Sequence, residues 1–243
     1  MKATVQAFAL HSLRYGDSSL IVSCFTKQFG LQSYILKGIL STKRKKKLSK
    51  SLFEPLNLLE FEASRATENK LGYLNEAQIL EPYRSIPFDL KKKAVLFFLA
   101  EVIYQIVQEE QEANPDLFYF IKQRMLWLDQ EKKIGVFHLK FLLDLTQFMG
   151  FYPNLSQKEA PYFDLQEGCM SLHKPKNYFI EGPTKELWIQ LLGIGFDDIH
   201  RIDLMHQRKM KVLESLLNYF KLHLQQFKIP KSSAILNEVF KIS

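Results

Sequence analysis

A run of basic side chains is the feature of this sequence with the clearest potential for binding chemistry. The segment Ser41–Lys50 reads STKRKKKLSK and carries six basic side chains within eight positions. These charges repel one another, and bound phosphate groups would relieve that repulsion. A solvated linker without a ligand is the alternative interpretation. Because strand-like segments lie on both sides of the run, we expect a loop that projects from a β domain.

The excess positive charge of the chain is concentrated at one end. The 243 residues carry a formal charge of +7, but residues 1–50 hold ten Lys or Arg side chains against a single acid, Asp17. The remaining residues hold 23 basic and 25 acidic side chains. This distribution indicates a localised site for a polyanion rather than a generally basic surface.

Aromatic side chains are interleaved with the basic ones in the same region. A groove that follows a sugar–phosphate backbone while bases stack on rings can bind single strands of any sequence. We interpret Phe25 and Tyr34 as core residues, and Tyr15 and Phe29, which adjoin turns, as stacking candidates. The predicted nucleic-acid-binding residues are Arg14, Tyr15, Lys27, Phe29, Lys37, Lys43, Arg44, Lys45, Lys46, Lys47 and Lys50.

The elements that must position these residues are short strands. Five segments have the alternation and the β-branched or aromatic content of strands. They are Thr4–Leu10, Ser19–Thr26, Leu31–Leu36, Leu56–Glu62 and Leu71–Leu80. Connected by short turns, they suit a small closed barrel, which has no exposed edges, and a small sandwich is the alternative.

After Pro87 the hydrophobic period becomes helical. The predicted helices are Phe88–Glu110, Asn114 to about Leu128, about Ile134 to Met149 ended by Gly150, Thr184–Leu192, Met205–Phe227 and Ser233–Phe240. Residues 151–182 are rich in turn residues and predict an irregular insertion, with a hairpin as one form it could take. The fold class is therefore α+β, with a β domain over residues 1–83 and a helical domain over residues 84–243.

Catalytic and metal-binding signals are weak. Cys169 and His173 form a C-x3-H pair, but a structural zinc site needs four ligands. A second cluster consists of Asp198, His200, Asp203 and His206, which helix-surface positions explain more simply. Phosphate-binding loops, dinucleotide fingerprints and nucleophile elbows are absent from the sequence, so we expect a protein that is not an enzyme.

Phenylalanines of the helical domain suggest a second kind of surface. A groove lined by some of them and edged by cations would accept an acidic, hydrophobic peptide tail, whereas an ordinary aromatic core is the alternative. The rings are Phe97, Phe98, Phe118, Phe120, Phe137, Phe141 and Phe148, and the cations are Lys122, Arg124, Lys132, Lys133 and Lys140.

Composition also bears on the compartment. The longest apolar run, Ala94–Ala100, is far shorter than the roughly 20 residues that cross a bilayer, and the N-terminus does not have the pattern of an export signal. Cys24 and Cys169 do not form a disulfide framework. We expect a cytoplasmic protein with no membrane partner.

The order of short motifs resembles the bacterial recombination mediator RecO family. The motifs are Gly16–Val22, Phe25-Thr26 followed by Gly30, Leu36-Lys37-Gly38 before the basic run, Leu52 followed by Pro55, and the C-terminal stretch Lys211–Phe240. The resemblance implies an N-terminal five-stranded OB-fold barrel and a helical C-terminal domain. It also implies a nucleoid-associated protein that binds single-stranded DNA, with double-stranded DNA as a further ligand, and anneals complementary strands. Its implied partners are RecR and the C-terminal tail of single-strand-binding protein, with which it would load RecA.

Many members of that family have a four-cysteine zinc site in the insertion that follows the equivalent of Gly150. This sequence keeps only Cys169 there, so we expect no zinc and no other cofactor, with the insertion held by packing of Tyr162, Phe163, Leu165 and Phe179. Two other functions fit the residues. One is an RNA-binding barrel protein, and the other is an interaction scaffold that acts through the helical domain.

Overall fold

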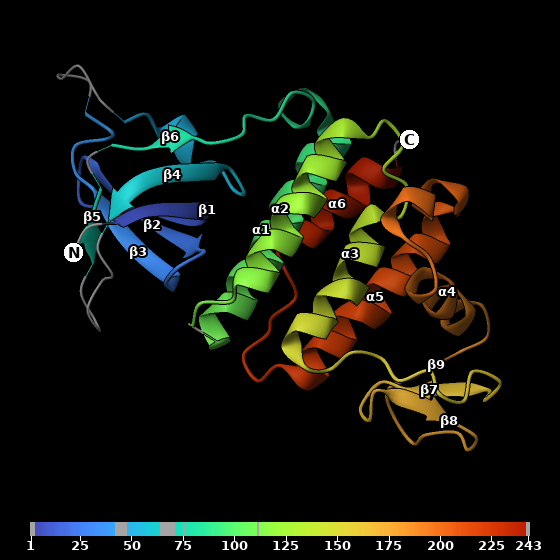
Figure 1. The fold of residues 1–243 in the computed structure, drawn as a ribbon. Helices are drawn as coiled ribbons and strands as arrows, with labels where there is room; N and C mark the ends of the chain where they lie inside the picture. The colour runs from blue at the N-terminus through green and yellow to red at the C-terminus, as the bar shows by residue number, and fades with distance from the viewer. Residues whose placement is uncertain (1–2, 42–47, 64–70, 75, 111, 242–243) are drawn as a thin grey trace. The chain divides into compact units, whose positions relative to one another are not determined.

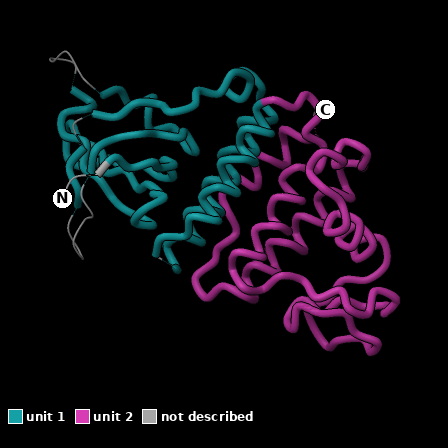
Figure 2. The backbone as a smooth tube through the Cα atoms, viewed as in Figure 1, with its two compact units in different colours: residues 1–129 teal, residues 130–243 magenta. Residues whose placement is uncertain are grey.

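The computed structural model describes residues 3–41, 48–63, 71–74, 76–110 and 112–241. The chain forms two compact units, Met1–Asp129 and Gln130–Ser243 (Figure 2). The first unit contains the strands of the predicted β domain together with the first two long helices. An N-terminal strand-rich part is therefore followed by a helical part, as the α+β prediction requires (Figure 1).

The strands of the first unit form one sheet with the order β5-β3-β2-β1-β4-β6. Their bounds are β1 Ala3–Tyr15, β2 Ser19–Thr26, β3 Gly30–Leu36, β4 Leu58–Ala63, β5 Gly72–Tyr73 and β6 Gln78–Ile79, with a 3-10 helix η1 at Lys50–Phe53. The long β1 pairs with β4 through its first half and with β2 through its second half. A register shift between Ala9 and His11 marks the bulge that lets one strand serve both partners.

The predicted fifth strand closes the sheet in two pieces. Tyr73 of β5 pairs in parallel with Ile35 of β3 at one edge, and six residues later Ile79 of β6 pairs antiparallel with Leu59 of β4 at the other edge. The two pieces of the predicted fifth strand thus supply both edges of the sheet, as the fifth strand of an OB-fold barrel pairs with both the third and the fourth. The predicted strand Leu71–Leu80 is confirmed only in part, because the described residues form two separate two-residue strands, Gly72–Tyr73 and Gln78–Ile79.

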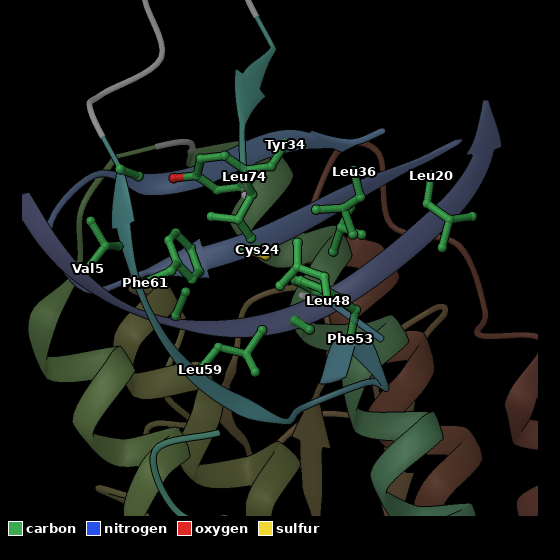
Figure 3. Close-up of a cluster of buried hydrophobic side chains, with 14 of the residues drawn as sticks. Val5, Leu20, Cys24, Tyr34, Leu36, Leu48, Phe53, Leu59, Phe61 and Leu74 are labelled. Carbon is green, nitrogen blue, oxygen red and sulfur yellow. The ribbon is translucent and has the colours of Figure 1, made fainter. Parts of the chain in front are cut away.

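The barrel interior is filled by one apolar cluster (Figure 3). Alternate residues of β1, β2, β3 and β4 enter it because side chains along a strand point to opposite faces. Val5, Cys24, Tyr34, Leu59 and Phe61 are among its members. The Tyr34 ring meets the Phe61 ring edge-on at 5.2 Å, as aromatic quadrupoles prefer. The predictions of Tyr34 and Phe25 as core residues are confirmed, since each is only 1% exposed.

The outer face of β1 and β2 is covered by helices of the same unit. The helices are α1 Leu90–Glu110, which follows the 3-10 helix η2 Ile86–Phe88, and α2 Pro115–Gln130. The Phe118 ring of α2 lies 4.9 Å from that of Phe8 and 5.9 Å from that of Phe25. Asn114 caps α2, because its Oδ1 accepts the backbone N–H of Leu117 at 2.9 Å.

Asp129 ties the segment between barrel and helices to the end of α2. Its carboxylate accepts the backbone N–H groups of Arg84, Ser85 and Ile86 at 2.8–2.9 Å. Burial opposes ionisation of this group, but these hydrogen bonds outweigh burial and hold the pKa of Asp129 below its ordinary value. The buried Lys92 ammonium donates to Ser85 Oγ at 2.6 Å and to the Asp129 carbonyl at 3.0 Å.

The second unit is helical around one small sheet. Its elements are α3 Phe137–Leu145, η3 Thr146–Met149, α4 Gly182–Leu192, η4 Phe196–Arg201, α5 His206–His223 and α6 Ser232–Lys241, with strands β7 Tyr162–Asp164, β8 Cys169–Ser171 and β9 Phe179–Glu181. Gly150 stops the third helix with a left-handed φ of 75°, as predicted. The insertion, expected to be irregular or a hairpin, is a three-stranded sheet of order β8-β7-β9.

Candidate nucleic-acid interface

Three predicted contact residues gather at one end of the barrel. The β1–β2 turn brings Tyr15 opposite Ser19, and the next pairing brings Leu20 opposite Leu36. Arg14, Tyr15 and Lys37 therefore lie at the same end, across three adjacent strands spaced about 5 Å apart. All three side chains are exposed, and Tyr15 is 53% accessible. We call this the basic end of the barrel.

The basic run begins at the same end. Leu40 N–H donates to the Ser18 carbonyl at 2.9 Å, which ties the chain beyond β3 to the β1–β2 turn. Lys43, Arg44, Lys45, Lys46 and Lys47 lie outside the described residues. The described chain resumes at Leu48, which is buried in the barrel core, and Lys50 is exposed in η1. The run thus leaves the barrel next to Arg14, Tyr15 and Lys37.

Tyr73 belongs to the basic end and was missed by the sequence analysis. Its ring is 63% exposed, and the Lys37 ammonium lies 4.6 Å from the ring centroid. Gly72 makes this possible, since a Cβ there would lie 2.6 Å from the buried Tyr34 ring. The signal was a glycine–tyrosine pair within a predicted strand. Because β5 runs parallel to β3, its tyrosine reaches the end where β3 stops.

Lys27 and Phe29 lie at the opposite end, which corrects the expectation of one groove. They occupy the β2–β3 turn, about 23 Å from the β1–β2 turn at roughly 3.3 Å per residue of β2. The Lys27 ammonium contacts the Tyr119 hydroxyl of α2 and lies 4.5 Å from the centroid of that ring. Phe29 is half-buried against the barrel core. In an antiparallel meander, successive turns lie at opposite ends of the sheet. The predicted order of strands and turns therefore already implied that the β2–β3 turn lies opposite the β1–β2 turn.

The arginine of the basic end is oriented by its own turn. Arg14 Nε donates to the Gly16 carbonyl at 3.4 Å, and its Nη2 donates to the Asp17 carbonyl at 3.3 Å. These bonds hold the guanidinium against the β1–β2 turn without using the carboxylate of Asp17. Arg14, Lys37 and two exposed rings can thus meet phosphates and unstacked bases together.

Inside the barrel the ionisable groups are held neutral. Burial raises the pKa of the Cys24 thiol to about 12. Burial, and then the nearby Cys24, also raise the pKa of Tyr34 far above its ordinary value. A neutral, fully enclosed thiol is a poor nucleophile. Cys24 therefore serves as a core residue.

The insertion does not fit a zinc ion of the kind its family resemblance implies. Cys169 pairs with Asp164 across β7 and β8, and Asn154 makes an isolated bridge to it. The Asp164 carboxylate accepts the backbone N–H groups of Gln166 and Glu167 instead. Among the described residues, neither this region nor the Asp198–His206 cluster gathers three metal-ligating side chains. The donor set lacks the thiolates that such a site uses.

Packing anchors the insertion to the helices of its unit. Phe163 and Leu165 are buried, as expected, and the Phe163 ring lies 5.4 Å from that of Trp188 in α4. The Tyr219 hydroxyl of α5 donates to the Phe151 carbonyl at 2.7 Å. His223 Nε2 donates to the Leu165 carbonyl at 2.9 Å. Tyr162 and Phe179 meet edge-on at 5.7 Å.

The phenylalanines proposed to line a peptide groove are mostly core residues. In the first unit Phe98 and Phe118 are fully buried, and in the second unit so are Phe137 and Phe141. Of the candidate cations, Lys140 is buried and pairs with Asp144 at 2.6 Å. The alternative interpretation, an aromatic core, is therefore the one that the burial of these rings supports.

Comparison with known proteins gives consistent matches over the whole chain. Residues 1–83 match the family described as Recombination protein O N terminal, and residues 87–233 match Recombination protein O C terminal. A protein of Christiangramia forsetii named DNA repair protein RecO is 37% identical over 235 residues, covering 97% of this chain and 98% of its own. Proteins of the same name from Flavobacterium psychrophilum, over 99% and 100% of the two chains, and from Bacteroides fragilis, over 95% and 96%, are each 34% identical.

Proposed function

The chain belongs to the RecO family of DNA repair proteins, and from that premise we propose that it is a recombination mediator that binds single-stranded DNA at the basic end of its barrel. The observation that supports this most directly is the convergence of Arg14, Tyr15, Lys37 and Tyr73 where the basic run leaves the barrel. Cations there neutralise phosphates, and the exposed rings offer stacking surfaces.

In this proposal the protein anneals complementary strands without covalent chemistry. Two strands repel each other because both are polyanions, and a cationic surface that holds them lowers this repulsion while leaving the bases free to pair. Double-stranded DNA is then the product and a weaker ligand. The proposal therefore includes no catalytic residue and no cofactor.

The proposed partner proteins follow from family membership. We assign RecR and the C-terminal tail of single-strand-binding protein as partners with which RecA is loaded onto coated DNA. The proposed location is the bacterial nucleoid in the cytoplasm. None of the described helices is long and apolar enough to cross a bilayer.

Salt dependence of binding tests the proposal. If the basic end and its loop neutralise four to six phosphates, log K for single-stranded DNA falls with log salt with a slope of roughly −3 to −4. The triple variant Lys45→Glu, Lys46→Glu, Lys47→Glu should bind about tenfold to a hundredfold more weakly and show a shallower slope. Fluorescence anisotropy with a labelled oligonucleotide, measured from low to moderate salt, gives both quantities.

Lys27→Glu is the matched control, because Lys27 lies at the opposite end of the same barrel and contacts Tyr119. It should change affinity less than twofold. Equal losses in the control and the triple variant, or a slope near zero for the unmodified protein, contradict the proposed interface. Competition between DNA and RNA strands of equal sequence then separates the DNA-binding role from an RNA-binding one, which requires contacts to the 2′-hydroxyl.

A further inference from the structure

The second unit carries its own excess of positive charge. Residues 205–243 hold seven Lys or Arg side chains against two acids, whereas residues 51–204 hold sixteen against twenty-three. Arg208, Lys211 and Lys221 are exposed along α5, and Arg208 and Lys211, three residues apart, lie on one side of the helix. This cationic stretch plays no part in the barrel site described above.

Two hollows adjoin this side of α5, with volumes of about 290 and 360 Å³. The first lies against α4 and includes Arg208, and the second lies against β9 and includes Asn218. Thr184 and Lys211 belong to the lining of both, so the two hollows lie side by side between α5 and the elements β9 and α4, and we call the pair the groove. Each is large enough for a small-molecule-sized group such as a nucleotide.

Tyr178 lines the second hollow of this groove and has a strained backbone conformation. Its φ is 49°, a left-handed value that bulky side chains rarely adopt, and its side chain is 55% exposed. The Tyr178 carbonyl accepts the Leu165 N–H at 2.8 Å, which fixes the backbone to the insertion. Strain of this kind persists where the surrounding structure enforces it, often at ligand-binding positions.

The insertion that presents this ring is rigidly supported. Phe163, Trp188 and Tyr219 form a chain of ring contacts of 5.3–6.1 Å that joins the small sheet to α4 and α5. Trp188 Nε1 also donates to Ser215 Oγ at 3.0 Å. An exposed ring on such a platform is pre-organised to receive a base, because little conformational freedom is lost on binding.

We propose that this groove is a second contact site for single-stranded nucleic acid, with a base stacked on Tyr178 and phosphates bound by Arg208 and Lys211. The inference rests on the proposed function, because annealing requires that one protein molecule hold a second polyanion. The lining combines apolar residues such as Leu187 and Val212 with the cations Arg208 and Lys211, and these cations favour a phosphate-bearing strand over an uncharged peptide.

The acidic side chains of the groove restrict where phosphates bind. Glu181 pairs with Lys174 at 3.5 Å, which leaves Glu186 and Glu214 as the acids that line it. Lys174 itself lies 4.9 Å from the Phe179 ring centroid, and Lys176 is exposed in the same turn. With the Lys174–Glu181 pair counted as neutral, the cations Lys176, Arg208 and Lys211 remain against the acids Glu186 and Glu214.

The test separates binding of a first strand from annealing of a second. One variant, Arg208→Glu with Lys211→Glu, removes the phosphate contacts. A second, Tyr178→Asn, removes the ring but keeps a residue that tolerates left-handed backbone. In the full-length protein each should leave oligonucleotide affinity, measured by anisotropy, within about twofold and slow annealing of complementary labelled strands at least tenfold. Lys132→Glu with Lys133→Glu, at exposed lysines elsewhere in this unit, is the matched control and should anneal normally.

Photocrosslinking gives an independent readout. A bromouracil-containing oligonucleotide should crosslink to the peptide that contains Tyr178 in the unmodified protein and not in Tyr178→Asn. The inference is wrong if both groove variants anneal normally, or if the control variant is slowed as much as they are. It is also wrong if the groove variants lose only the binding of a peptide partner. If the unmodified protein binds no oligonucleotide in dilute buffer, it is the proposed function that fails.

Discussion

His138 shows how a single buried side chain makes the fold sensitive to pH. It lies in α3, is 3% exposed, and its ring lies 5.1 Å from the Phe240 ring of α6 in a tilted arrangement. Its Nδ1 is one of the buried side-chain atoms for which the described residues provide no hydrogen-bond partner. Burial, and secondarily the charge of Lys209, lower the pKa of His138 from 6.5 to about 3.

The sign of the resulting pH dependence follows from proton linkage. Between pH 6.5 and 3 the unfolded chain binds a proton at this position and the folded chain does not, so stability falls as the pH is lowered. At pH 5 the loss from this group is about 2 kcal/mol relative to neutral pH. His138→Phe should remove this part of the pH dependence, as measured by urea unfolding at pH 7.5 and pH 5.

His173→Gln provides the comparison for that measurement, because His173 is exposed in the insertion. It should keep the full loss of stability at pH 5. An unchanged pH dependence in His138→Phe would mean that the buried imidazole does not control it.

Residue types were easier to predict than residue neighbours. The basic run, Tyr15 and Lys37 could be identified from sequence because charge and aromaticity are properties of single residues. Lys27 was misplaced because its position depends on which strand end its turn occupies. Tyr73 was missed because its position depends on the parallel pairing of β5 with β3, a long-range contact that the local glycine–tyrosine pair does not specify.

At the scale of elements, closure of the barrel depends on a close approach at Gly72. The buried Tyr34 ring packs over this glycine and against Phe61, and it is only 1% exposed. Gly72→Ala would place a Cβ 2.6 Å from a ring that has no room to move. We expect a loss of about 1–3 kcal/mol in the free energy of unfolding and weaker DNA binding, because β5 carries Tyr73.

Thermal unfolding and oligonucleotide anisotropy of the same samples check both expectations. Gly195→Ala is the control, since a Cβ there meets open space and its φ of −79° suits any residue. If Gly72→Ala unfolds and binds like the unmodified protein, Gly72 does not govern closure.

Helix ends were predicted correctly where a capping residue marks them in the sequence. Gly150 ended the third helix, and Asn114 with Pro115 opened α2, because caps act within one turn of the helix. The insertion was predicted to be irregular or a hairpin rather than a three-stranded sheet, because its three-residue strands are too short to show alternation. Their pairing is instead supported by side chains of α4 and α5.

At the scale of the whole molecule, the first compact unit extends further along the chain than the strands of the β domain do. The predicted domain boundary after Tyr83 marks where strands end, and it remains our proposal for the limit of the DNA-binding domain. The compact unit, however, extends to Asp129. Phe118 covers Phe8 and Phe25 on the outside of the barrel, and Asp129 binds the backbone of residues 84–86.

Truncation distinguishes these two boundaries. A fragment of residues 1–83 would expose Phe8 and Phe25 and lose the covering helix, at a cost of about 1.5–3 kcal/mol for each ring left in water. We expect it to aggregate or unfold, whereas a fragment of residues 1–129 should unfold cooperatively in urea and keep the single-strand affinity of the full chain within about threefold. A folded 1–83 fragment of equal affinity would show that the helices are dispensable. A folded 1–129 fragment without affinity would place the main DNA contact in the second unit instead, because the basic end would then be present and inactive.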